Sequence, residues 1–175
     1  MVAEACGAAA AALIGVVSTL NHQLEQLSGQ LERHFEIHPD AEIVRSLPGL
    51  GLILGARVVA EFGDDPTRYA NPKARKNYAG TAPITRASGK RQVVVARLAR
   101  NRRLADACYQ WAFSALTASP GARAFYDRCR AAGKTHPQAL RALANRLVGI
   151  LHGCLRHRSR YNELQAWPAA TQHAA

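Results

Sequence analysis

The residues of this sequence best suited to chemistry are Ser88-Gly89-Lys90-Arg91. A serine hydroxyl can attack phosphorus, and neighbouring cations can stabilise the negative charge that develops during the attack. Ser88 would then be the nucleophile, with Lys90 and Arg91 beside it. Serine and glycine are also common in ordinary turns, so the residue types alone favour a turn. The surrounding sequence has to decide between these interpretations.

The positive charge of the chain is concentrated around this serine. Residues 68–160 hold 20 of the 23 Lys and Arg residues but only two of the 12 acidic residues. Such a block repels itself unless it faces a polyanion, and a nucleic-acid backbone releases counterions when cations neutralise it. Nucleic acid is therefore the favoured partner. A solvated surface and an anionic membrane are the weaker alternatives.

The sequence predicts no metal site within the chain. Two-metal phosphoryl transfer needs several converging carboxylates, whereas residues 68–160 contain only Asp106 and Asp127. The four cysteines form no CxxC pair and the seven histidines lie at no ligand spacing around them, which argues against zinc and against a disulfide framework. The 13-residue apolar run at 5–17 is too short to span a bilayer. We therefore expect a cytoplasmic protein with no membrane partner.

The beginning of the chain predicts a helical arm over 8–35, within a segment 1–37. Apolar residues recur there at alternating spacings of four and three, as in a coiled coil: Leu13, Val17, Leu20, Leu24, Leu27 and Leu31. Such an arm would make the protein a homo-oligomer. Three heptads are few, so a helix packed on its own domain stays an open alternative.

After the arm we expect a compact helical domain over 38–163. Asp40 can cap a short helix over 41–46, and an apolar helix through residue 60 follows the turn Leu47-Pro48-Gly49-Leu50-Gly51. Two glycines between short helices are typical of a helix-hairpin-helix, in which backbone amides approach a phosphate. Gly49 and Gly51 would be the phosphate contacts. An ordinary Pro-Gly turn is the alternative.

Cap residues and apolar spacing predict the remaining elements, so the fold class is mainly α. Further helices are expected over 71–78, 103–118, 120–133 and 135–156, where Thr135 and Gln138 fit a capping box. The β-branched run within 92–96 predicts an extended stretch that is too short for a sheet. Residues 164–175 are expected to form a disordered tail.

Several segments occur in the order of a known architecture. They are Leu47 to Gly51, 60–64, Tyr78-Ala79-Gly80 with Ala82-Pro83, Ser88-Gly89-Lys90 and 100–104. In this order they resemble the carboxy-terminal domain of the one-ten family of insertion-sequence transposases, the bridge-RNA-guided recombinases. The resemblance covers about residues 38–163, and the arm is similar to the coiled coil that precedes this domain in the family.

The resemblance implies a composite site for DNA strand cleavage and exchange. In the family a RuvC-like domain with four metal-binding acidic residues precedes the coiled coil, and the carboxy-terminal domain contributes a nucleophilic serine, which falls on Ser88. Mg²⁺ is expected on those acidic residues, which this sequence lacks, so the chain is expected to be incomplete alone. A guide RNA would select the target. The expected DNA-binding residues are therefore backbone contacts: Gly49, Gly51, Arg86, Arg97, Arg100, Arg102 and Arg103.

Two other functions remain open from the sequence. A noncatalytic helix-hairpin-helix module would bind DNA through Gly49, Gly51 and the basic block, and would be indifferent to Ser88. An interaction protein would dimerise through its arm and would bind any polyanion through its basic face.

Overall fold

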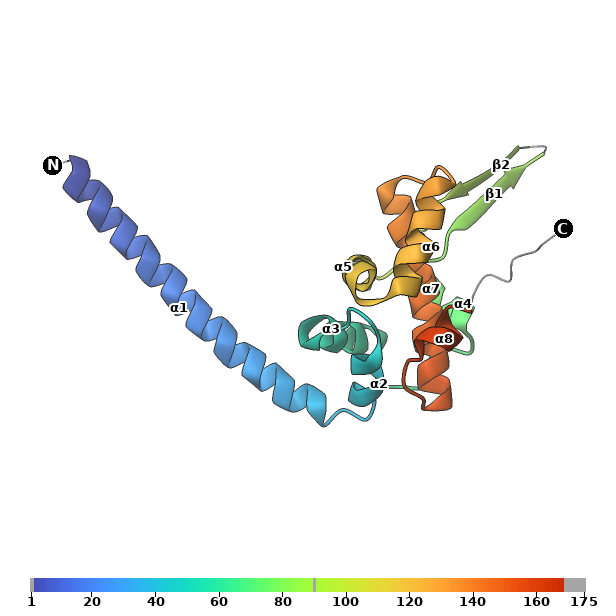
Figure 1. The fold of residues 1–175 in the computed structure, drawn as a ribbon, viewed down its shortest axis with the longest axis horizontal. Coiled ribbons are helices and arrows are strands. Elements are labelled where there is room, and N and C mark those ends of the chain that lie inside the picture. Colours follow the sequence, from blue (N-terminus) through green and yellow to red (C-terminus); the bar gives the residue numbers. More distant parts are fainter. Residues whose placement is uncertain (1, 90, 169–175) are drawn as a thin grey trace. The chain divides into compact units, whose positions relative to one another are not determined.

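The computed structural model describes residues 2–89 and 91–168 as two compact units, one ending at His38 and the other beginning at Pro39. The first unit is the helix α1, Val2–Glu36 (Figure 1). Its predicted apolar seam is exposed, since Leu13, Leu20 and Leu24 each keep more than half of their surface accessible. By length and composition alone α1 could also cross a membrane, because an 18-residue window has a mean hydropathy of 1.7. The 13-residue run at 5–17, from which no membrane partner was expected, is shorter than this apolar window of α1.

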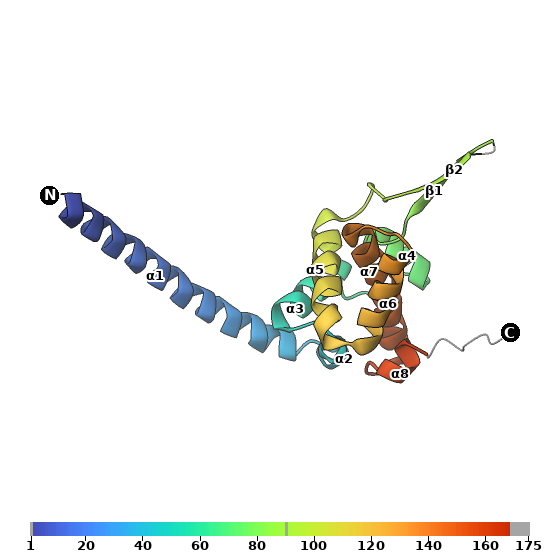
Figure 2. The same cartoon turned by 45° about the horizontal axis from the view of Figure 1, so that its top comes forward.

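The second unit is mainly α, as predicted, and its core forms between long helices. It comprises α2 (Ala41–Ser46), α3 (Leu52–Phe62), α4 (Pro72–Tyr78), α5 (Arg102–Ala118), α6 (Pro120–Ala131), α7 (His136–His157) and α8 (Glu163–Ala166). Helix α7 packs against α4, α5 and α6, and α3 packs against α5 (Figure 2). Trp111, Leu104 and Leu147 are fully buried at these contacts.

Most helices begin where the sequence places their caps. The Asn71 side chain accepts a hydrogen bond from the Ala74 amide, and Ser119 caps α6 in the same way. Thr135 and Gln138 form the predicted capping box of α7. The cap predicted for α2 is wrong, because Asp40 makes no side-chain cap hydrogen bond and pairs with Arg158 instead.

Two predictions about irregular regions differ from the structure. Residues expected to be too short for a sheet form a two-stranded antiparallel sheet of β1 (Ile84–Ser88) and β2 (Arg91–Val95). The predicted tail begins within α8, where Ala166 is buried and Glu163 accepts a hydrogen bond from the Gly121 amide at 2.7 Å. The residues after 168 lie outside the described part.

Candidate nucleic-acid interface

Ser88 lies at the end of β1, next to the loop of the hairpin. The register pairs Ser88 with Arg91, so two residues, 89 and 90, connect the strands. Gly89 has φ 55°, a left-handed conformation that two-residue hairpin loops of the primed types require and that glycine adopts without strain. Figures 1 and 2 show this hairpin extending away from the helices. The serine hydroxyl is therefore presented at a free end of the unit.

The hairpin register gathers the predicted cationic residues on the face of Ser88. Side chains alternate between the two faces of a strand, and directly paired residues share a face. Arg86, two residues before Ser88, and Arg91, its cross-strand partner, therefore lie on the same face as the serine. All three are exposed. Lys90, the other predicted catalytic residue, lies outside the described residues.

The predicted arginines after β2 lie in the segment that connects β2 to α5 and in the first turn of α5. Arg100 donates a hydrogen bond to the Arg97 carbonyl at 2.9 Å, and its aliphatic stem lies so close to Gly80 that a Cβ there would approach it to 2.1 Å. Arg102 and Arg103 are exposed in the first turn of α5. Cations are unfavourable at the positive end of a helix dipole. An anion bound there would relieve this repulsion.

Asn101 fixes the end of this basic segment. Its side chain caps α5 by accepting from the Leu104 amide at 3.1 Å, and it donates to Glu61 at 2.7 Å and to the Tyr78 hydroxyl at 3.2 Å. These bonds join α3, α4 and α5 at one point. The arginine segment therefore leaves the helices from a fixed position.

Two cavities near the hairpin root are lined by cationic side chains, two of which, Lys134 and Arg141, were not predicted as site residues. A cavity of about 470 Å³ lies between β2 and the α6–α7 region and is lined by Val94, Phe125, Lys134 and Arg141 among others. A second cavity of about 330 Å³ is lined by Arg100, Arg102 and again Arg141. Only the overall charge of residues 68–160 pointed to Lys134 and Arg141. Their proximity to the hairpin depends on the tertiary fold.

The two glycines in the turn between α2 and α3 differ in their surroundings. Gly49 has φ 79°, and a Cβ there would lie 2.7 Å from the Ala115 nitrogen of α5, so this glycine allows close packing. The Trp111 indole also donates to the Pro48 carbonyl at 2.9 Å, which fixes the turn on α5. Gly51, in contrast, is exposed at the start of α3, and no atom lies within 4 Å of the place that a Cβ would take. Of the two, only Gly51 has the open surroundings that a phosphate contact needs.

Acidic groups do not converge on the hairpin. No cluster of three His, Cys, Asp or Glu side chains suited to a metal occurs among residues 2–89 and 91–168. Asp106 pairs with Arg57 at 2.9 Å, and Asp127 pairs with Arg123 at 2.9 Å. The described residues therefore do not provide a side-chain cluster that fits a divalent cation.

Comparison with known proteins finds a matching family and several relatives of this chain. Residues 41–127, which include the hairpin, match the family described as Transposase IS116/IS110/IS902. The chain is 49% identical over 151 residues to the "Mini-circle putative transposase for IS117" of Streptomyces coelicolor, covering 86% of this chain and 36% of that protein. It is 38% identical over 160 residues to the "Insertion element IS900 uncharacterized 42 kDa protein" of Mycobacterium paratuberculosis, covering 91% and 39%.

The alignments extend over most of this chain but over a limited part of each relative. The chain spans about two fifths of the length of these curated relatives. A third relative, the "Insertion element IS110 uncharacterized 43.6 kDa protein" of Streptomyces coelicolor, is 34% identical over 93% of this chain. The family resemblance inferred from the ordered motifs is confirmed, and the chain belongs to the Transposase IS116/IS110/IS902 family.

Proposed function

We propose that this chain is the serine-bearing part of a DNA transposase and that Ser88 is its nucleophile. The observation that carries the proposal is the hairpin register, which presents an exposed Ser88 on one face with Arg86 and Arg91. Family membership supports the same assignment, because the matched residues include all three. The chain would act on DNA in the cytoplasm.

The proposed step exchanges one phosphoester bond for another. The Ser88 oxygen bonds to phosphorus of a DNA phosphodiester, the bond from phosphorus to one deoxyribose oxygen breaks, and that oxygen leaves with a proton. The serine proton passes to a base, which the acidic domain implied by the family resemblance would supply. Arg86, Arg91 and Lys90 would stabilise the charge on the phosphoryl oxygens. The acidic domain implied by the family resemblance would hold Mg²⁺ and complete the site.

Nucleic-acid backbone contacts would continue from the hairpin to the helices. Arg97, Arg100, Arg102 and Arg103 follow β2 in sequence, and Lys134 and Arg141 line the adjacent grooves. Backbone contacts position a duplex without reading its bases. A guide RNA, as the resemblance implies, would then supply the choice of sequence.

Substitutions on the two faces of the hairpin test Ser88. With the acidic domain supplied in trans and Mg²⁺ present, Ser88→Ala should abolish covalent protein–DNA adducts on a nicked trapping substrate. Thr85→Ala removes a hydroxyl from the opposite hairpin face and should leave adduct formation unchanged. Ala87→Ser in the Ser88→Ala background moves the hydroxyl to that opposite face and should not restore adducts. Undiminished adducts in Ser88→Ala would refute the assignment.

The cationic neighbours need a separate test because they could act in binding alone. Arg91→Ala should lower the cleavage rate more than it weakens DNA binding, because Arg91 lies directly across from Ser88. Gln92→Ala, one residue along on the other face, is the control. Equal losses of binding and cleavage in Arg91→Ala would reduce this arginine to a phosphate anchor.

We also propose that α1 associates with copies of itself as a coiled coil. The exposed Leu13, Leu20 and Leu24 support this, because their side chains lack a partner surface within the described chain. Leu24→Lys should lower the mass measured by light scattering to that of the monomer. Glu25→Lys, a charge change at a seam-flanking position, should retain the oligomer. A wild-type monomer would refute the coiled coil.

A noncatalytic DNA-binding module is the second candidate, and Gly51 is the observation that favours it. Gly51 is exposed at the amino terminus of α3, where backbone amides without helix partners can bind a phosphate. This candidate predicts salt-sensitive DNA binding that Ser88→Ala leaves unchanged and that yields no adduct. Similar affinities for heparin and duplex DNA would instead favour general polyanion binding.

A further inference from the structure

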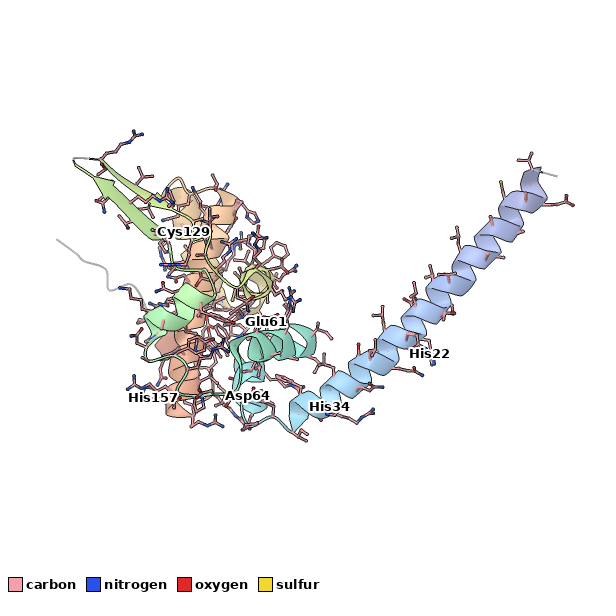
Figure 3. The ribbon with its side chains drawn as sticks, turned by 180° about the vertical axis from the view of Figure 1, so that it is seen from behind. His22, His34, Glu61, Asp64, Cys129 and His157 are labelled. Atoms are coloured by element: carbon pink, nitrogen blue, oxygen red, sulfur yellow. The ribbon has the colours of Figure 1, made fainter. Side chains whose placement is uncertain are left out.

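A cavity at the carboxyl-terminal end of α7 contains buried polar groups without partners. It has a volume of about 700 Å³, within the range of small-molecule sites, and lies at the opposite end of α7 from Gln138 and Arg141 at the hairpin root. Figure 3 labels Asp64, which lines it, and His157 at this end of the unit. His152 and Arg75 line the cavity with only 7% and 6% of their surfaces exposed.

Both of these side chains retain unused hydrogen-bonding atoms. Neither ring nitrogen of His152 nor the Arg75 Nε has a hydrogen-bond partner among the described residues. A buried polar group without a partner is costly, so such groups are normally satisfied by protein, water or a ligand. The Arg75 guanidinium is held in place between rings, at 4.8 Å from the Phe62 centroid and 4.6 Å from that of Tyr69. The guanidinium is therefore ordered at the cavity wall, with its Nε enclosed and its terminal nitrogens as the donors that a ligand could reach.

The electrostatic environment at the His152 end is cationic. Burial lowers the pKa of His152, and the charges of Arg75, Arg156 and Lys76 lower it further. The acidic residues of the cavity have partners within the same lining: Asp40 pairs with Arg158, and Asp65 accepts from the Thr67 amide and hydroxyl. Asp64 also has an interaction partner. A small anion near His152 would meet donors and positive charge together.

We propose that this cavity binds one phosphoryl group, held by Arg75, His152 and Arg156. Arg75 supplies the terminal nitrogens of a buried guanidinium, and the exposed Arg156 supplies charge at the cavity rim. The His152 ring nitrogens are enclosed beside the cavity, so His152 would turn one N–H toward the bound anion. Asp64 and Asp65 line the same cavity and disfavour a second phosphate, so a single phosphoryl group fits better than a polyphosphate. The source is either free phosphate or the terminal phosphate of a nucleic-acid strand. This site does not depend on the function proposed for Ser88.

Thermal unfolding of the whole chain in sodium phosphate, compared with sodium chloride of equal ionic strength, tests the site. At a phosphate concentration ten times Kd, we expect the Tm to rise by about 3–5 °C. The rise should persist in Ser88→Ala and in Arg128→Ala, which removes one exposed arginine from α6 outside the cavity. It should disappear in His152→Leu and Arg156→Ala. Arg156 is exposed, so its variant remains informative if His152→Leu fails to fold.

Short oligonucleotides distinguish the two sources. A strand with a 5′-phosphate that binds at least tenfold more tightly than its 5′-hydroxyl counterpart, with the difference lost in Arg156→Ala, identifies a nucleic-acid end. Equal binding of the two strands together with the phosphate-dependent Tm rise identifies free phosphate. The proposal is overturned by a wild-type Tm that does not rise above that in chloride, or by an equal rise in Arg156→Ala and His152→Leu. The cavity would then hold ordered water only.

Discussion

Replacing Gly49 with alanine should destabilise the second unit strongly. The left-handed φ of 79° costs an alanine about 1–2 kcal/mol. The added Cβ would also lie 2.7 Å from the Ala115 nitrogen and 2.9 Å from the Ser114 carbonyl carbon. These are backbone atoms of α5 and cannot rotate away, and overpacking of this kind costs about 1–3 kcal/mol. Together the two effects lower the free energy of unfolding by about 2–5 kcal/mol.

Urea denaturation followed by tryptophan fluorescence measures this effect, because Trp111 and Trp167 both lie in the second unit. Gly51→Ala is the matched control, since its φ is −71° and no atom lies within 4 Å of the added Cβ. We expect it to change the free energy of unfolding by less than about 0.5 kcal/mol. Equal urea midpoints for the Gly49 and Gly51 variants would refute the packing role. A Gly49 variant that is fully stable but fails to bind DNA would restore it as a phosphate contact.

Three further perturbations test other contacts of the same unit. Gly121→Ala should displace Trp167, whose ring would lie 2.2 Å from the added Cβ, and should shift tryptophan emission; Gly153→Ala, with open space around it, should not. Although burial raises the pKa of Glu163, hydrogen bonds from two side chains and one backbone amide lower it overall. The ionised Glu163 therefore stabilises the fold fully at pH values above the ordinary glutamate pKa, and this stabilisation is lost as the pH falls through the lower pKa of the folded state. Glu163→Gln should accordingly reduce the loss of Tm below about pH 4.5. Amides at the hairpin tip should exchange with solvent faster than those of α7 and become protected on DNA binding; protection equal to that of α7 without DNA would contradict a marginal hairpin.

Helix boundaries could be predicted well from this sequence because they depend on local caps. Asn71, Ser119 and Thr135 each satisfy backbone amides within a few residues, so their effect is visible in the sequence. Asp40 shows the limit of this reasoning. Its carboxylate pairs with Arg158, far along the chain, and a competing partner of that kind has no local signal.

The hairpin could be predicted only in part, and the cavity could not be predicted, because it depends on tertiary structure. The extended stretch expected within 92–96 corresponds to β2, but its pairing with β1 was not expected. A half-buried strand is recognised in a sequence by alternating apolar and polar residues, and the consecutive valines of β2 lack this alternation. In the structure Val93 and Val94, on opposite faces, are both substantially exposed. Ser88 itself could be singled out from its cationic neighbours, whereas the shared face with Arg86 required the register. The burial of Arg75 and His152 is equally invisible in sequence, since both types are usually exposed or half-exposed.

The placement of Ser88 constrains how any chemistry there could be controlled. The chain just before β1 is held in place, because the Thr81 hydroxyl donates hydrogen bonds to the Lys76 carbonyl and to the Asn145 side-chain oxygen at 3.3 Å each. The tip has only two strands, and an isolated two-stranded hairpin is marginally stable in water. In-line attack on phosphorus needs reacting atoms held near about 3–3.5 Å and aligned, which such a tip cannot maintain alone. If Ser88 is the nucleophile, as we propose, the order required for reaction would come from the DNA and from the domain proposed to supply the base, and DNA binding would be coupled to activation of the serine.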